Sequence, residues 1–472
     1  MILPRDERWF MAFVVAFVAI LAACYPPTYA IEDEFNILSL ATAISRGTVL
    51  LDRAGLDLDA DVLWNGHRIS KFSPFHAALF APAIVTSWRL AFAVTALFAI
   101  AGAFIVRGML RLHGLSSAWV ALYFLCAGLW FYSRTLMAAV PASVLVLLGA
   151  WLLIRDSSRP AAAGASLSFA GLFHPWMIPV SVALSIGWWL DAPRTRFKSL
   201  LVLVAAAMPG AVALLAYNAY TTGSPFLNVY ALLGTHYGFK GENLSAFLPF
   251  YAGSLLLMPL AGWAALSPRW SGGLGIPFAV GTVILMGSFY YFRDGMSYGV
   301  AGLLPGQRFL LPASLVACVP AARFISHHGS EFVRAKGSGF RLLRWAPAAA
   351  FVCFVAGFTA VSIGHGDYLQ AHASVQQAIR STIPDGSRVL LGDRAFKELA
   401  PVLGDWRLRQ VRADVPAPSA REGAYAVWIG PPDSVPPGGW LDGSSPVRVA
   451  ARSWIWKRDV WIVPPASTGM RP

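Results

Sequence analysis

The sequence has little charge for its length. Only 13% of its 472 residues are charged, while 57% are hydrophobic, and the mean hydropathy is +0.57. A soluble domain usually carries about 25% charged residues, so this chain has too few to cover the surface of a soluble globule of its size. Disorder is excluded as well, because a chain this apolar must bury its side chains. The membrane-embedded class of protein remains.

Cysteines and nucleotide-binding signatures are also scarce. The four cysteines lie in or beside apolar stretches without CxxC spacing; they are Cys24, Cys126, Cys318 and Cys353. The sequence therefore supports neither a disulfide framework nor a zinc site, and small packing residues are the simpler interpretation. GxxxxGK[ST] and GxGxxG loops, which bind nucleotide phosphates, are missing from the sequence.

The net charge of +13 does not indicate a nucleic-acid partner. No stretch interleaves basic and aromatic residues in the manner of a nucleic-acid-binding face. The basic residues gather instead in short connections between apolar stretches, as they do in the cytoplasmic loops of membrane proteins. We therefore expect membrane lipid as a partner and no nucleic acid.

Eleven apolar stretches are candidates to cross a bilayer, which takes about 20 residues. They are 9–24, 90–106, 116–132, 136–154, 161–173, 177–190, 200–220, 248–266, 274–292, 304–322 and 345–363. No small-x-small cleavage site follows the first stretch, so we interpret it as a retained anchor rather than a signal peptide.

The short basic connections alternate with longer ones, which places the amino terminus in the cytoplasm by the positive-inside rule. An odd number of spans then places the tail outside, together with the long first loop, 25–89. The sequence thus predicts an all-α polytopic membrane bundle of about 11 transmembrane helices over residues 1–363. A small extracytoplasmic α/β domain is predicted over 364–472.

Shorter elements are predicted from the same patterns. In the tail they are helices over 374–383 and 396–403, strands over 388–391 and 425–429, and a hairpin of 454–456 with 460–463. In the first loop, an amphipathic helix is expected over 35–46, and the apolar run 77–85 is too short to span. The doublet His327-His328 is expected in a cytoplasmic loop.

The first outer loop carries the residues with the clearest chemistry. Asp33 and Glu34 follow the first span at the edge of the hydrocarbon, where a carboxylate holds a proton more tightly and makes a better general base. A solvated acidic loop is the alternative. Lys71 could snorkel to the interface, neutralise a phosphate, or hold the Asp33 carboxylate. Because ATP and nucleotide sugars are cytoplasmic, a reaction on this side needs a donor such as a lipid-linked sugar.

This arrangement resembles a known superfamily. The acidic pair Asp33-Glu34 directly after the first span, followed by Lys71-Phe72-Ser73-Pro74, resembles the GT-C integral-membrane glycosyltransferases, which use polyprenyl-phosphate sugars. The likeness is greatest to bacterial proteins related to protein O-mannosyltransferases and aminoarabinose transferases (glycosyltransferase family 39-like). It implies that Asp33 is catalytic with Glu34 beside it, and that Lys71 binds the donor phosphate. Ser73 stands where a proline is common in the family.

Further segments between residues 9 and 322 carry the same resemblance. Tyr217-Asn218, followed by a Gly-Ser-Pro turn, matches an element that precedes a loop tyrosine, here Tyr230. The resemblance implies sugar contacts, although a plain turn at a helix end would look the same. Arg308 lies in a matching Gly-x-Arg-Phe-Leu-Leu-Pro segment and is expected to bind the donor phosphate. A carboxylate could equally be the partner that an arginine at this depth needs.

Arg134 and His236 are further candidates for substrate binding, and His236 could be a plain loop residue. Several relatives place an acid shortly after the position of Arg134, where this chain has Ala138, Ala139 and Val140. This departure puts a carboxylate-bound metal in doubt. No cofactor is required by the sequence, although a divalent metal is possible.

The sequence therefore predicts a glycosyltransferase in a bacterial inner membrane. It would take a sugar from a polyprenyl-phosphate donor on the periplasmic face and transfer it, with the inversion that the resemblance implies, to a lipid, glycan or protein acceptor. The alternatives are a transporter or flippase of lipid-linked intermediates and a glycan polymerase. A transporter would favour ionisable residues at span centres and internal repeats, and the sequence shows neither.

Overall fold

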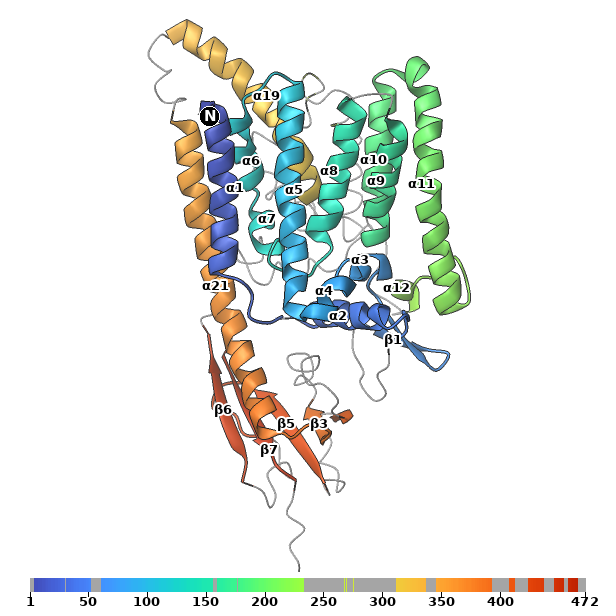
Figure 1. The fold of residues 1–472 in the computed structure, drawn as a ribbon, viewed down its shortest axis with the longest axis vertical. Coiled ribbons are helices and arrows are strands. Elements are labelled where there is room, and N and C mark those ends of the chain that lie inside the picture. The colour runs from blue at the N-terminus through green and yellow to red at the C-terminus, as the bar shows by residue number, and fades with distance from the viewer. Residues whose placement is uncertain are drawn as a thin grey trace, which may run out of the picture. The chain divides into compact units, whose positions relative to one another are not determined.

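The computed structural model of the protein is mostly helical (Figure 1). The residues it describes are 4–29, 31–51, 61–155, 159–175, 177–232, 267, 269, 275, 311–336, 345–392, 407–411, 423–436, 445–453 and 457–465. The chain divides into two compact units, one of Met1–Ala23 with Ala91–Ser362 and the other of Cys24–Leu90 with Ile363–Pro472. The predicted domains 1–363 and 364–472 stay a prediction.

Apolar helices make up the first unit. α5, α8, α9 and α11 are neighbours in this order (Figure 1). Its described helices include α1 (Arg5–Ala23), α5 (Ala91–Leu112), α8 (Ala139–Arg155), α9 (Pro160–Phe173), α10 (Met177–Leu190), α11 (Pro193–Thr222), α12 (Val229–Leu232), α19 (Leu311–Lys336) and the first part of α21 (Ala346–Thr382).

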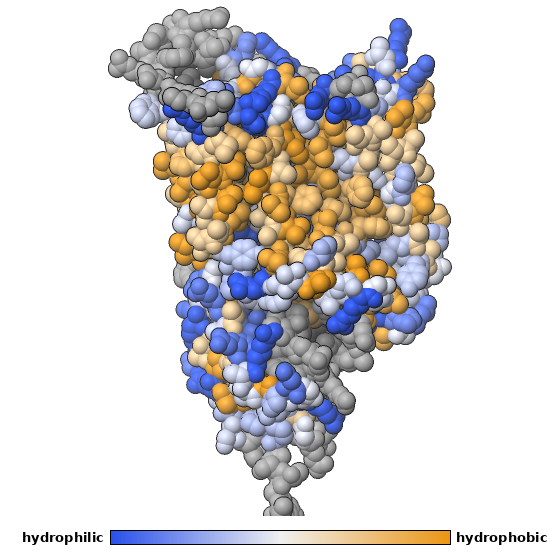
Figure 2. Space-filling model, in the orientation of Figure 1, coloured by the Kyte–Doolittle hydropathy of each residue, from blue (hydrophilic) through white to orange (hydrophobic). Residues whose placement is uncertain are grey.

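The length and surface of these helices identify an integral membrane protein. Three described segments are long and apolar enough to cross a membrane, namely Trp88–Leu112, Pro193–Thr222 and Ala346–Thr382. Apolar side chains form a broad band over the helical unit (Figure 2), and an apolar surface of this extent is unfavourable in water. The predicted stretches 248–266 and 274–292 lie outside the described residues, so the number of eleven spans stays a prediction.

α9 and α11 approach each other closely at two glycines. A Cβ atom on Gly164 would lie 2.1 Å from the carbonyl oxygen of Leu203, and one on Gly210 would lie 1.9 Å from Ser168 Oγ. Small residues at such crossings let helix backbones pack tightly inside a membrane. Ser168 Oγ also donates a hydrogen bond to the Ala207 carbonyl across this contact (2.9 Å).

An apolar groove of about 370 Å³ lies among α9, α10 and α11. Leu167, Ile178 and Met208 are among its lining residues. The hydroxyls of Ser181 and Ser185, which also line it, donate to backbone carbonyls. The groove therefore presents hydrocarbon to any occupant.

The predicted span 116–132 is wrong as a continuous helix. The structure divides it into η2 (Ser117–Val120), α6 (Ala121–Phe124) and α7 (Ala127–Tyr132), with Cys126 in an extended conformation. The Trp130 indole N–H donates to the carbonyl of Phe124, and Cys126 Sγ donates to that of Leu122. Side chains thus satisfy carbonyls near the break, which hydropathy alone cannot predict.

A carboxylate joins the start of α1 to two other elements of the first unit. Glu7 Oε2 accepts a hydrogen bond from Arg107 of α5 (2.7 Å), and Oε1 accepts from Arg111 (2.5 Å) and from Ser117 Oγ of η2 (2.8 Å). Both carboxylate oxygens are therefore engaged. Glu7 acts as a structural tie between α1, α5 and η2.

The first loop folds into short elements of the second unit. They are α2 (Glu32–Ser45), β1 (Asp61–Trp64), β2 (His67–Ser70), α3 (Pro74–Ala78), α4 (Ala81–Thr86) and η1 (Trp88–Leu90). α2 begins three residues before the predicted 35–46, which puts the acids inside its first turn. The apolar run 77–85 is not one segment, because it is divided between α3 and α4.

α21 does not end where the apolar stretch ends at residue 363. It continues to Thr382 and includes most of the predicted helix 374–383, so the expected separation of the two is wrong. The continuation buries one face, which carries Leu369, His372, Val375 and Ile379 at helical spacing. Burial of this stripe outweighs the weak helix preference of the glycines at its start.

The tail forms a five-stranded mixed sheet of order β4-β3-β5-β7-β6. The strands are β3 (Arg388–Gly392), β4 (Arg407–Val411), β5 (Ala424–Gly430), β6 (Val447–Arg452) and β7 (Lys457–Val463). β3 runs parallel to β4 and β5, and β7 runs antiparallel to β5 and β6.

Several predicted tail elements can be compared with this sheet. β3 and β5 coincide with the predicted strands, whereas the hairpin partner of β7 is β6 rather than 454–456. The predicted helix 396–403 and residues 454–456 lie outside the described residues. Elsewhere, His327 and His328 lie within α19, so the predicted loop there is wrong.

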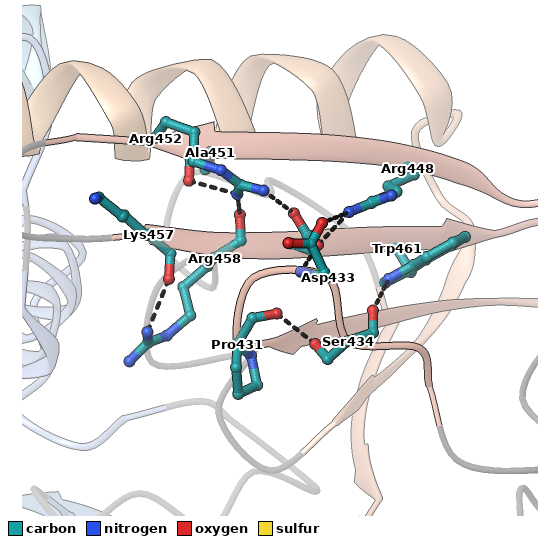
Figure 3. Close-up of polar contacts among 10 residues, drawn as sticks. Pro431, Asp433, Ser434, Arg448, Ala451, Arg452, Lys457, Arg458 and Trp461 are labelled. Atoms are coloured by element: carbon teal, nitrogen blue, oxygen red, sulfur yellow. Dashed lines mark hydrogen bonds and ion pairs between the residues drawn. The ribbon is translucent and has the colours of Figure 1, made fainter.

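A buried aspartate, Asp459, ties the edge of this sheet together. Figure 3 labels three residues that contact it, namely Arg448, Arg452 and Asp433. Asp459 accepts hydrogen bonds from Arg448 (2.6 Å), Arg452 (2.8 Å) and the backbone N–H of Asp433 (2.6 Å). Desolvation alone would raise the pKa of Asp459, but these hydrogen bonds outweigh it and hold that pKa below its ordinary value. Asp459 is thus a structural anion that fixes β6 against β7.

Candidate active site

Asp33 lies in the first turn of α2. Ile31 precedes the helix in an extended conformation, and its carbonyl accepts hydrogen bonds from the backbone N–H groups of Glu34 (3.1 Å) and Phe35 (3.2 Å). Acidic residues at a helix amino terminus are favoured by the helix dipole, by about 0.3–1 kcal/mol each. Part of the reason for an acidic cluster here is therefore structural.

Lys71 directly follows β2 and pairs with this acid. Its Nζ lies 3.1 Å from Asp33 Oδ1, and the two side chains are only 8% and 17% exposed, respectively. The ammonium also lies 5.1 Å from the ring centre of Phe72, within cation–π range. Of the three roles that the sequence leaves open for Lys71, the structure shows it holding the Asp33 carboxylate.

A tight hairpin fixes the position of Lys71. Asn65 and Gly66 connect β1 to β2 with φ values of 48° and 81°, as a two-residue type I′ turn requires. The strands pair in register from Asp61 with Ser70 to Trp64 with His67. Lys71 is therefore set by rigid backbone on one side and by the start of α3 on the other.

Asp33 keeps unused acceptor capacity. In the part of the chain that the structure describes, Lys71 contacts Oδ1 and no residue contacts Oδ2. A carboxylate offers about four acceptor positions on its two oxygens. A substrate hydroxyl could therefore donate to Asp33 while the Lys71 pair stays intact.

Further buried polar side chains lie on α2 and α3, which pack together. Glu34, Asn36 and His76 are 2%, 0% and 1% exposed, respectively. A buried polar group costs free energy unless hydrogen bonds compensate it. Sequence reasoning missed Asn36 and His76. Asn36 lies four positions before Leu40 in α2, and both are buried. This helical spacing could have indicated a buried polar side chain at Asn36.

The other predicted site residues lie in other segments of the chain. Arg134 belongs to the first unit, where it is 1% exposed and its Nη1 donates to the Ser362 carbonyl (3.0 Å). Tyr230 lies in α12, and its side chain is not among those described. His236 and Arg308 lie outside the described residues. Their substrate contacts stay predictions.

The Tyr217-Asn218 segment ends α11 with a well-defined cap. Asn218 Nδ2 donates to the Pro225 carbonyl (3.1 Å), and Thr222 Oγ1 donates to the Asn218 carbonyl (2.7 Å). Gly223 closes the helix in the left-handed conformation with φ 81°, which favours glycine. The turn that the sequence offered as an alternative is therefore present, and sugar binding by Tyr217 and Asn218 stays a prediction.

Metal-ligand clusters are not found among the described residues, since no group of three or more His, Cys, Asp or Glu side chains could hold an ion there. Lys71 supplies a positive charge next to Asp33. The described site thus offers a carboxylate acceptor and a fixed cation for anion binding.

The fold matches that of a protein of known structure. The chain is similar to ArnT from Cupriavidus metallidurans bound to undecaprenyl phosphate, with 13% identity and a TM-score of 0.61 over 96% of this chain and 98% of that chain. The apo state of ArnT from the same organism gives 14% identity and a TM-score of 0.59 over 97% and 98%. This chain has the ArnT fold. No protein-family model and no curated protein matches the sequence.

The similarity extends over nearly the whole chain, tail included. It therefore confirms the predicted resemblance at the level of the fold. A shared fold does not establish an activity, which has to be argued from the residues at the site.

Proposed function

We propose that the protein is a glycosyltransferase that uses a polyprenyl-phosphate sugar as its donor. It transfers one sugar, with inversion, to a hydroxyl of a lipid, glycan or protein acceptor. The observation that carries the proposal is the buried Asp33–Lys71 pair in a chain with the fold of a protein that binds undecaprenyl phosphate.

Asp33 is the proposed general base. As the acceptor oxygen forms its bond to the anomeric carbon, the hydroxyl proton passes to Asp33. The bond from that carbon to the phosphate oxygen breaks on the opposite face, and the electron pair leaves with polyprenyl phosphate. Glu34, buried one residue on, supports the position of Asp33.

Lys71 and Arg308 are the proposed phosphate-binding residues. Negative charge grows on the departing phosphate, so fixed cations there lower the barrier. An ammonium group has three N–H donors, so one lysine can serve both a carboxylate and a phosphate, and we assign this double role to Lys71. In this proposal the base and the leaving group share one side chain, Lys71.

The remaining predicted residues are assigned to the substrates. Tyr217, Asn218, Tyr230, His236 and Arg134 would contact the sugar or the acceptor, and a divalent metal stays possible. The apolar groove among α9, α10 and α11 has the chemistry to receive part of a polyprenyl tail. The basic connections favour a bacterial inner membrane with a cytoplasmic amino terminus and a periplasmic tail.

Sugar transfer by the purified protein tests the proposal. Full-length protein in lipid nanodiscs is incubated with a panel of labelled polyprenyl-phosphate sugars and candidate acceptors. Asp33→Asn is expected to lower the transfer rate by about 10²–10⁴-fold, the usual contribution of a general base. Arg308→Ala is expected to lower it as well.

Asp191→Asn is the matched control. Asp191 pairs with Arg196 at 3.6 Å and its side chain is 32% exposed, so this change removes an acid from an ion pair of another unit. Transfer should persist. An Asp33→Asn protein that transfers sugar at the unaltered rate would exclude Asp33 as the base.

A transporter is distinguished in sealed proteoliposomes. A transferase releases polyprenyl phosphate and yields glycosylated acceptor. A flippase moves the labelled lipid between leaflets with its sugar still attached, and that result would replace the proposed function.

A further inference from the structure

A second polar site lies in the second unit, between α21 and β6. It is an open pocket of about 490 Å³ lined by Ile363, Gly364, Asp367, Arg452 and Ser453. None of these residues belongs to the candidate active site. The walls of the pocket combine one acid, one base and one apolar side chain.

The pocket lies where the apolar part of α21 ends. Residues 346–366 contain no Asp, Glu, Lys or Arg, and Asp367 is the first such residue in the helix. A helix rises 1.5 Å per residue, so about 20 residues cross the hydrocarbon. Ile363, which is 61% exposed, and Asp367 therefore straddle the level at which acyl chains give way to headgroups.

Arg452 retains hydrogen-bond donors that can point into this pocket. Its Nη1 donates to the carbonyls of Ala451 (3.1 Å) and Arg458 (2.6 Å), and its Nη2 donates to Asp459 (2.8 Å) (Figure 3). These contacts use three of the five N–H groups of a guanidinium. In the described part of the chain, the other two have no protein acceptor, and the side chain is 39% exposed.

Arg452 offers its remaining donors to an anion. Asp459 pairs with both Arg448 and Arg452, and Arg448 also pairs with Asp433. A phosphate could accept hydrogen bonds from the remaining Arg452 donors. Asp367, on the α21 wall, provides a carboxylate for a cation in the same pocket.

We infer that this pocket binds the headgroup of a phospholipid that carries a primary ammonium group, of the phosphatidylethanolamine type. The phosphate binds Arg452, the ammonium donates to Asp367, and the glycerol end lies against Ile363. A choline headgroup carries three methyl groups in place of the N–H donors, so it cannot donate to Asp367. This site is separate from the proposed transfer reaction and does not depend on it.

Lipid binding by the full-length protein tests the inference. Protein stripped of lipid in detergent is titrated with short-chain phosphatidylethanolamine, phosphatidylcholine and phosphatidylglycerol, and bound lipid is counted by native mass spectrometry. Phosphatidylethanolamine should bind on the order of tenfold more tightly than phosphatidylcholine, the ratio expected for one charged hydrogen bond.

Variants on the two walls should respond differently. Asp367→Asn should reduce the affinity for phosphatidylethanolamine towards that for phosphatidylcholine, and it should not weaken the binding of phosphatidylglycerol. Arg452→Gln should weaken all three lipids on the order of tenfold. Arg448→Gln is the matched control, because Arg448 also binds Asp459 from β6 but does not line the pocket.

Three results would overturn the inference. One is equal binding of the three lipids by the unaltered protein. Another is an Asp367→Asn protein that keeps its preference for phosphatidylethanolamine. The third is free phosphoethanolamine binding as tightly as the lipid, which would make the pocket a site for a soluble metabolite.

Discussion

Two carboxylates in different units, Glu7 and Asp33, are almost equally buried but differ in how many donors they meet. Their side chains are 11% and 17% exposed. Glu7 accepts from Arg107, Arg111 and Ser117 on both of its oxygens, whereas Asp33 meets Lys71 on one. An acid surrounded by donors holds elements together. An acid with spare acceptor capacity can take a proton from a substrate.

Asp459 supports this distinction. It is fully buried and has three donors, two guanidinium groups and one backbone N–H. It therefore resembles Glu7 rather than Asp33. Burial alone does not distinguish Glu7, Asp33 and Asp459. The number of hydrogen-bond donors around each carboxylate distinguishes the two structural acids from the proposed base.

Replacement of Lys71 gives the largest expected effect after replacement of Asp33 itself. Lys71→Met should lower sugar transfer by about 10²–10³-fold, because the charge on the leaving phosphate loses a fixed partner. Lys71→Arg should recover part of the rate, since it keeps the charge with a different shape. Initial rates per folded molecule measure this. If the Lys71→Met protein transfers sugar at the full rate, the Asp33–Lys71 pair has only a structural role.

Removal of the Glu7 charge should affect stability instead. Glu7→Gln leaves Arg107 and Arg111 without their anion and is expected to lower the free energy of unfolding by about 2 kcal/mol. Thermal unfolding in detergent measures the change, and Asp33→Asn should lower the melting temperature less. The comparison fails if Glu7→Gln loses transfer activity while its melting temperature is unchanged.

The pH dependence of the sheet gives a smaller effect. The pKa of Asp459 is lowered in the folded state, so its contribution is complete above the ordinary aspartate pKa of about 3.9. It is lost as pH falls through the lower folded value. Tryptophan fluorescence of the full-length protein should therefore report acid unfolding of the sheet. Asp459→Asn should flatten that dependence, and an unchanged acid transition in this variant would contradict the assignment.

The exposed Asp191–Arg196 pair should matter least. Their side chains are 32% and 28% exposed, and exposed pairs contribute little because water screens them. Asp191→Asn is expected to change the free energy of unfolding by less than about 0.5 kcal/mol. Denaturant titration measures it. A loss as large as that of Glu7→Gln would show that donor number does not rank these acids.

The Asp33–Lys71 contact was only partly predictable. The sequence places both residues in one loop and offers the contact as one of three roles for Lys71. The choice depended on the β1–β2 hairpin, which the pattern of the loop did not predict. The donors around Glu7 were equally hidden, because they come from residues about one hundred positions away.

The sequence by itself determined the membrane class and most of the described helices, because hydrophobic length is a local property that each stretch carries alone. α10, for example, has the predicted limits, 177–190. Only the tertiary structure decided where helices break or continue. Near the break at Cys126, the Trp130 indole donates to the Phe124 carbonyl. The extension of α21 to Thr382 carries a buried face, and its Gln376 accepts a hydrogen bond from Thr28. Trp130 and Phe124 are six positions apart, and Thr28 and Gln376 are 348 apart. In neither case does the hydropathy of a stretch record which donor meets which acceptor.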